Sequence, residues 1–150
     1  MRVFLCASLI LVVAFTGCTR PSQIQPGDLH AFTTDGCSGG FPEGPAGHPN
    51  LWCDCCVAHD LAYWKGGTWK QREAADTKLG ECVAEKHRAV TGIVMKLGVR
   101  VGGTPYLPTS YRWAYGWPFL RGYAPLTLEE ERVVNDQEKD YEKARKARCG

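Results

Sequence analysis

The 150-residue sequence predicts a mainly α-helical domain held by disulfide bonds. Residues 52–64 and 69–97 carry apolar side chains at helical spacing. Capping boxes, in which Thr is followed three residues later by Gln or Glu, stand at residues 68–71 and 127–130 and mark two helix starts. The third observation is a set of eight cysteines in a chain long enough for one modest core. The formal net charge of +2 is too small to indicate a nucleic-acid partner.

Residues 1–17 are organised as an export signal. Arg2 provides the basic start, and residues 3–15 form an apolar run that is too short to span a membrane comfortably. The run leads into Phe-Thr-Gly-Cys, which resembles a bacterial lipoprotein box, although Phe15 departs from the aliphatic residue usual there. We therefore expect an exported lipoprotein anchored through Cys18 in the periplasm or outer membrane. An ordinary signal peptide and a secreted protein are the alternative.

The next two segments are rich in loop-forming residues. Residues 18–33 contain two prolines and few apolar side chains, which indicates a tether or an ordered arm, and we assign them as a tether. Residues 35–50 contain five glycines and three prolines and are predicted to form a loop. Glycine lets backbone carbonyls turn towards a cation, and calcium prefers such oxygen ligands, so a calcium loop and a plain surface turn are both open.

Residues 52–64 form the first predicted helix. Pro49 cannot lie inside a helix, Asn50 can accept a bond from a first-turn amide, and the glycine pair at 66–67 ends the helix. At about 100° per residue, an arc of about 140° gathers a base, a carboxylate and a phenol with two cysteines. This face consists of Trp52, Cys55, Cys56, His59, Asp60 and Tyr63. A functional His-Asp face and a merely solvated or satisfied pair are the two interpretations.

The second predicted helix begins at the Thr68 capping box and continues at helical spacing to Leu97. Asp76 lies in the middle of its mostly apolar stripe, where an ionised carboxylate needs a partner. Either Asp76 serves a functional site or it forms a salt bridge with Arg72, four residues earlier.

Two positions farther along bear on where this helix ends. Gly92 is expected to bend or break it, so that residues 90–101 form a separate segment. His87 lies on the same stripe and is predicted to be a core or interfacial histidine rather than a catalyst.

Residues 104–150 combine an aromatic segment with a polar helix. Five aromatic residues alternate at period two from Tyr111 to Phe119, but the glycines and proline among them favour an irregular loop over a short strand. The rings either cover the open side of the helices, which is the preferred interpretation, or meet a lipid interface. A capping box then opens a polar helix to about Ala147, whose thin apolar stripe needs Cys149 or a partner to stay docked.

Export changes how the cysteines are interpreted. Cys6 leaves with the signal and Cys18 would be lipidated, so an even number remains for pairing. Three disulfides are expected among the remaining cysteines, which are Cys37, Cys53, Cys55, Cys56, Cys82 and Cys149. The alternative is a zinc site built from Cys53, Cys55, Cys56 and a histidine. The spacing is not the usual paired Cys-x2-Cys, and the exported context disfavours free thiols.

The motif Cys-Cys-x-x-His-Asp-x-x-Tyr at residues 55–63 resembles the catalytic helix of secreted phospholipases A2. The preceding Thr-Asp-Gly-Cys-Ser at residues 34–38 resembles the calcium loop of the bacterial branch of that family. The resemblance covers residues 35–82, roughly a third of the chain. Many animal members carry a cysteine three residues after the histidine, where this chain has Ala62, so at least one family disulfide is missing.

The resemblance implies a fold and a disulfide pattern. It implies a disulfide-linked antiparallel helix pair of phospholipase A2 type in a core of residues 34–103, followed by the aromatic loop and polar helix of residues 104–150. It pairs Cys37 with Cys56, between the calcium loop and the first helix, and Cys55 with Cys82, between the two long helices. Cys53 and Cys149 then remain as the third pair.

The resemblance also implies a set of site residues. His59 would act as the base, and Tyr63 would steady Asp76. In the family an aspartate six residues before a cysteine on the second helix orients the histidine, and Asp76 reproduces that spacing. The cofactor would be Ca2+, held by Asp60 together with the two loop residues Asp35 and Gly36.

The implied function is calcium-dependent hydrolysis of the sn-2 ester of phospholipids, with a phospholipid or a membrane surface as the partner. The commonest hydrolase alternative is disfavoured, because no Gly-x-Ser-x-Gly motif is present. A second hypothesis is non-catalytic: a disulfide-stapled envelope protein that keeps the scaffold for binding. The first hypothesis requires calcium and His59, whereas the second is indifferent to both.

Overall fold

The computed structural model describes residues 25–37 and 41–150. It is mainly α-helical, as predicted, and the described residues form no strand. The expected export signal at residues 1–17 and the lipidation site Cys18 lie outside the described residues. In chain order the elements are η1 (Pro26–Asp28), α1 (Cys53–Lys65), α2 (Trp69–Lys86), α3 (Ala89–Gly102), α4 (Leu128–Gln137), η2 (Glu138–Asp140) and α5 (Tyr141–Cys149).

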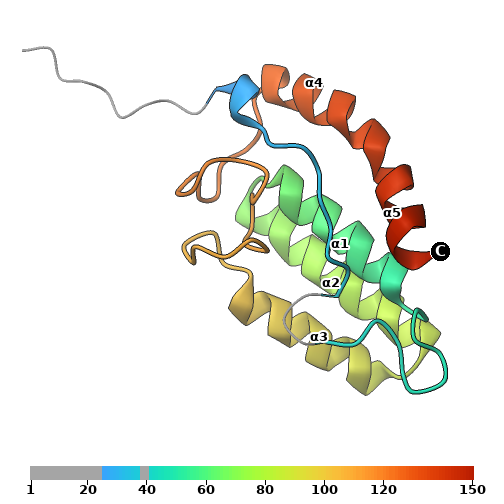
Figure 1. The fold of residues 1–150 in the computed structure, drawn as a ribbon. Helices are drawn as coiled ribbons and strands as arrows, with labels where there is room; N and C mark the ends of the chain where they lie inside the picture. Colours follow the sequence, from blue (N-terminus) through green and yellow to red (C-terminus); the bar gives the residue numbers. More distant parts are fainter. Residues whose placement is uncertain (1–24, 38–40) are drawn as a thin grey trace, which may run out of the picture.

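The helices are arranged around α1 and α2. Figure 1 shows α3 on one side of this pair and the C-terminal helices α4 and α5 on the other. The arm of residues 25–37 reaches both α1 and α5, since the Phe32 ring lies 5.7 Å from Trp64 and 6.2 Å from Tyr141, centroid to centroid. Leu29 and Phe32 are buried in the main core, so the described part of the predicted tether is an ordered arm.

The ends of α1 agree only in part with the sequence. Asn50 was expected to cap the helix, but the N-cap residue is Trp52, and it makes no side-chain cap bond. The Trp52 indole donates to the Pro42 carbonyl at 2.7 Å instead, which ties the start of α1 to the preceding loop. At the other end Gly66 adopts a φ of 71° and donates its N–H to the Ala62 carbonyl. The helix therefore ends at the glycine pair of residues 66–67, as the sequence predicts.

The predicted separate segment after α2 is present, but the break lies at His87 and Arg88 and not at Gly92. Gly92 lies inside α3 against α2, where a Cβ atom would come within 2.1 Å of the Gly80 carbonyl oxygen. The two glycines therefore let α2 and α3 pack closely as an antiparallel pair. His87 is exposed and lies beside Trp52, with ring centroids 5.4 Å apart, so it is not a core residue.

Three disulfides join Cys37 to Cys56, Cys55 to Cys82 and Cys53 to Cys149. These are the pairs expected in the sequence analysis. Because all six sulfurs are bonded in pairs, none is left as a zinc ligand, and the zinc alternative is wrong. Several disulfides in a chain of this size indicate an oxidising compartment. None of the described helices is long and apolar enough to cross a membrane.

The aromatic loop covers part of the main core. Trp113 and Trp117 are fully buried, and their indoles donate to the carbonyls of Gly67 at 2.9 Å and Lys65 at 2.8 Å. Other rings of the loop, among them Phe119, remain partly exposed. The predicted single polar helix is instead divided into α4 and α5 by η2, and its end is docked on α1 through Cys149.

Candidate active site

A buried polar network joins α1 to α2. His59 and Tyr63 are one turn apart on α1, and Asp76 lies opposite them on α2. His59 Nε2 lies 3.1 Å from Asp76 Oδ1, and the Tyr63 hydroxyl donates to the same oxygen at 2.7 Å. Asp76 has no exposed surface, and His59 is 8% exposed. The three side chains that helical spacing and the resemblance singled out therefore meet in one place.

Two arginines complete this network, and one of them, Arg100, was not considered from the sequence. Arg100 of α3 donates from Nε to Asp76 Oδ2 at 2.6 Å. Arg72 of α2 donates from Nε to the Tyr63 hydroxyl at 3.0 Å, and from Nη2 to the carbonyls of Val99 and Arg100. The expected alternative, a salt bridge between Arg72 and Asp76, is wrong because Asp76 pairs with Arg100. No local pattern indicates Arg100, which lies 24 residues away on another helix.

The hydrogen bonds and the burial of the network determine the protonation states of Asp76 and His59. Burial alone would raise the pKa of Asp76, but the bonds from His59, Tyr63 and Arg100 outweigh it and hold this pKa below its ordinary value. Ionised Asp76 is an acceptor only, so His59 Nε2 carries the shared proton. Burial lowers the pKa of His59 more than Asp76 raises it, so the ring is neutral near pH 7. The other ring nitrogen, Nδ1, then has a lone pair, and no described residue hydrogen-bonds it.

Asp60, the neighbour of His59, contacts the loop that precedes α1. The Thr34 hydroxyl donates to Asp60 Oδ2 at 2.6 Å and accepts the Gly36 N–H at 3.1 Å. Asp60 is 8% exposed. Burial raises the pKa of Asp60 to about 8, with the Thr34 hydrogen bond opposing the rise and the nearby Asp35 adding to it. A cation bound beside this carboxylate would keep it ionised.

The chemistry around Asp60 fits calcium. No three His, Cys, Asp or Glu side chains of the described residues gather into a metal-binding cluster, so a cation here would need backbone oxygens as well. Calcium accepts such mixed oxygen ligands. The Asp35 carbonyl already accepts two N–H bonds from Arg148. The candidate ligands among the described residues are therefore the Asp60 carboxylate of α1 and, from the loop, the Gly36 carbonyl and the Asp35 carboxylate.

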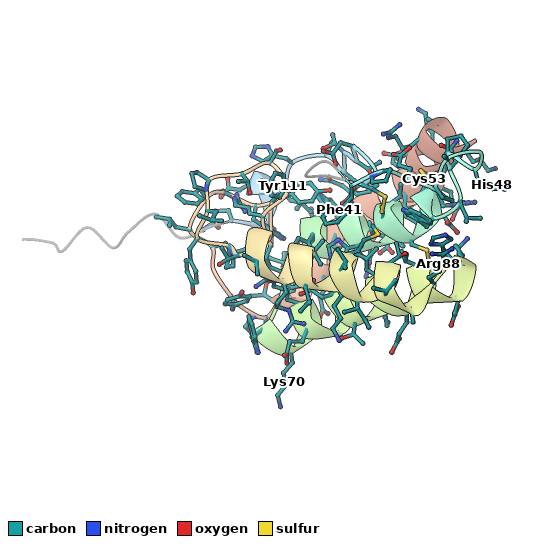
Figure 2. All side chains as sticks on the ribbon, turned by 90° about the horizontal axis from the view of Figure 1, so that it is seen from below. Phe41, His48, Cys53, Lys70, Arg88 and Tyr111 are labelled. Carbon is teal, nitrogen blue, oxygen red and sulfur yellow. A yellow bond between two sulfur atoms is a disulfide. The ribbon has the colours of Figure 1, made fainter. Side chains whose placement is uncertain are left out.

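A mostly apolar cavity of about 220 Å3 opens at the network. His59, Asp60 and Tyr63 line it from α1, and α3 lines it with small and apolar residues. Phe41 and Tyr111, which Figure 2 labels, complete the wall. A second hollow of about 190 Å3 lies on the loop side of Asp60 and is lined by Thr33, Thr34, Asp35, Asp60, Ser110, Tyr111 and Tyr115. Asp60 therefore borders both the cavity and the loop.

Comparisons of the chain with protein-family models, with curated proteins and with solved structures returned no match. The functional assignment therefore depends on the geometry and chemistry of the site itself.

Proposed function

We propose that the protein is a calcium-dependent, phospholipase A2-like esterase that hydrolyses the sn-2 ester of phospholipids. The observation that carries the proposal is the hydrogen bond from His59 Nε2 to buried Asp76, which leaves Nδ1 as a base at an apolar cavity. The resemblance of residues 35–82 to secreted phospholipases A2 supports the same assignment. The disulfides Cys37–Cys56 and Cys55–Cys82 also support it, because they tie the loop and the two helices together around His59.

In this reaction His59 takes a proton from water at Nδ1 as the water oxygen attacks the ester carbonyl, and later gives the proton to the leaving alcohol. Asp76 stays ionised, orients the ring and stabilises the imidazolium that forms. Tyr63 and Arg100 hold Asp76 from its two oxygens. A bound calcium ion would polarise the carbonyl and stabilise the developing oxyanion, with Asp60 and the loop residues Asp35 and Gly36 as its ligands.

The surroundings of the cavity favour an amphipathic substrate in a membrane. Helix α3 carries an exposed apolar face, and a face of this kind on a soluble domain often marks an interaction site. The apolar face of α3 consists of Val90, Ile93, Val94, Leu97 and Val101, each at least half exposed. The same helix lines the cavity through Met95, Gly98 and Val99. A phospholipid that enters the cavity from a membrane would pass beside this face. A lipid anchor at Cys18 in the bacterial envelope would keep the enzyme close to such a membrane.

The decisive test is His59→Gln, which keeps a polar side chain of similar reach but removes the base. Release of fatty acid from phospholipid vesicles should fall by about 10²–10⁴, the usual contribution of a general base. Calcium affinity, measured by isothermal titration calorimetry, should not change because His59 is no ligand. Asp60→Asn is the matched variant at the adjacent position and should lose calcium and turnover together.

Unchanged turnover in His59→Gln would end the esterase mechanism. A wild-type protein that releases no fatty acid and binds no calcium would favour the non-catalytic envelope scaffold instead.

A further inference from the structure

The C-terminal helix reaches the loop that contains the candidate calcium ligands. Arg148 of α5 donates from Nε and Nη2 to the Asp35 carbonyl at 3.0 and 2.9 Å, although 113 residues separate the two. The next residue, Cys149, is bonded to Cys53 at the start of α1. The disulfide therefore holds the Arg148 guanidinium at the loop from outside the segment that resembles phospholipases A2.

A second residue joins Arg148 at the same point. Glu43, farther along the loop, forms an ion pair with Arg148 Nη2 at 2.5 Å. The pair packs directly on Gly36, which has a φ of 77°. A Cβ atom on Gly36 would lie 1.9 Å from Glu43 Oε1 and 2.9 Å from Arg148 Nε. The positive φ favours glycine here, and a larger residue would also displace the ends of the Glu43 and Arg148 side chains.

Thr34 holds the same loop turn through a second set of hydrogen bonds. Its hydroxyl accepts the Gly36 N–H and donates to Asp60, as described above. The peptide units of Asp35 and Gly36 therefore lie between two fixed points, the Asp60 carboxylate and the Arg148–Glu43 pair. Residues Asp35 and Gly36 carry the candidate loop ligands, which are the Asp35 carboxylate and the Gly36 carbonyl.

We propose that Arg148 and Glu43 are a positioning pair, which presets the loop for calcium from the C-terminal helix. This inference rests on the proposed function, since it assumes that the loop binds calcium. Glu43 offsets part of the Arg148 charge, and the pair orients the Asp35–Gly36 backbone through the two bonds from Arg148 to the Asp35 carbonyl. Residues that orient metal ligands typically change metal affinity by about 10- to 100-fold when they are replaced. Arg148 is partly exposed, so the lower end of this range applies.

The test is the double variant Glu43→Gln/Arg148→Gln in the full chain, which removes the pair without changing the net charge. Calcium affinity, measured by isothermal titration calorimetry, should fall by about 10-fold because the loop loses its preset geometry. The matched control is Glu142→Gln/Arg145→Gln, which removes another ion pair of the same helix that does not touch the loop. Its calcium affinity should equal that of the wild type.

The outcomes separate this inference from the proposed function. A wild-type protein that binds no calcium would overturn both this inference and the calcium-dependent function. A wild type that binds calcium, together with an unchanged affinity in Glu43→Gln/Arg148→Gln, would overturn the role of Arg148 and leave the esterase standing. If mass spectrometry showed that the double variant had lost its disulfides, calcium affinity would be measured on Arg148→Lys instead. Lysine keeps the charge but cannot donate two bonds from one planar group, so a wild-type affinity in Arg148→Lys would also overturn the inference.

Discussion

The Asp76 carboxylate has no exposed surface, and an isolated ionised carboxylate in such a place would be very costly. Two donors on Oδ1 and Arg100 on Oδ2 offset this cost. One of the Oδ1 donors, the Tyr63 hydroxyl, is itself held by Arg72. The orientation of His59 therefore depends on one carboxylate whose position is fixed from three helices.

Tyr63→Phe tests whether the phenol only positions Asp76 or takes part in the reaction. The substitution removes the bond to Asp76 and leaves the buried Arg72 Nε without its acceptor, so the free energy of unfolding should fall by about 1–3 kcal/mol. Fatty-acid release should fall much less than in His59→Gln, because Asp76 keeps His59 and Arg100. Urea unfolding and the vesicle assay measure the two effects.

Tyr141→Phe is the control, since it removes a phenolic hydroxyl from α5, where the ring packs on Phe32 and lines neither hollow at the site. It should cost about 1 kcal/mol or less and leave turnover unchanged. A rate loss in Tyr63→Phe as large as that in His59→Gln would mean that the phenol takes part in the chemistry.

At the scale of helices, the capping boxes and the helical spacing were reliable local signals, whereas the lone Asn50 cap was not formed. The capping boxes at Thr68 and Thr127 are both formed, and the helical spacing of His59 and Tyr63 places them together. Gly92 was misjudged because a glycine in a helical pattern can mark either a break or a close approach. Only the neighbouring Gly80, on another helix, decides between the two.

Residues brought to the site from a distance could not be predicted in this way. Arg100 reaches Asp76 because α3 folds back on α2, and Arg148 reaches Asp35 because a disulfide docks α5. Each arginine lies in a segment whose own sequence is typical of a polar or amphipathic helix. The contacts follow from tertiary packing, which no periodicity encodes.

The exposed apolar face of α3 leads to a prediction for Ile93→Gln/Leu97→Gln. If this face meets the lipid surface, loss of two apolar side chains should weaken binding to phosphatidylcholine vesicles by about 10-fold or more, as co-sedimentation would show. Hydrolysis of a soluble short-chain ester should not change, because neither residue lines the cavity.

Leu128→Gln is the control for this face. Leu128 is an even more exposed leucine, but it lies at the start of α4, on the other side of α1 and α2 (Figure 1). Vesicle binding of this variant should match the wild type. Equal losses in both variants would show that binding does not depend on the α3 face.

At the scale of the whole molecule, the C-terminal third is part of the same folding unit as α1. Trp113, Trp117 and Val134 are buried in one cluster with α1 and the arm. The aromatic loop is tied to α4 by an ion pair in which Arg121 donates two bonds to Glu130, at 2.6 and 2.9 Å. Both side chains are almost fully buried, so protonation of Glu130 should lower the free energy of unfolding.

The pH dependence of stability tests this coupling. The bonds from Arg121 lower the pKa of Glu130 below its ordinary value of 4.5. A carboxylate with a lowered folded-state pKa stabilises the fold above about pH 4.5, and this contribution is lost as the pH falls through the lower value.

Glu130→Gln leaves a buried guanidinium without its counter-charge and should lower the free energy of unfolding by about 3 kcal/mol at pH 7. In urea unfolding, the difference between wild type and variant should shrink steadily below pH 4.5. Glu129→Gln, which breaks only an exposed pair with Arg132, should cost about 0.5 kcal/mol or less at either pH. A Glu130→Gln deficit that stays constant down to pH 3 would show that Arg121 does not depend on the charge of this carboxylate.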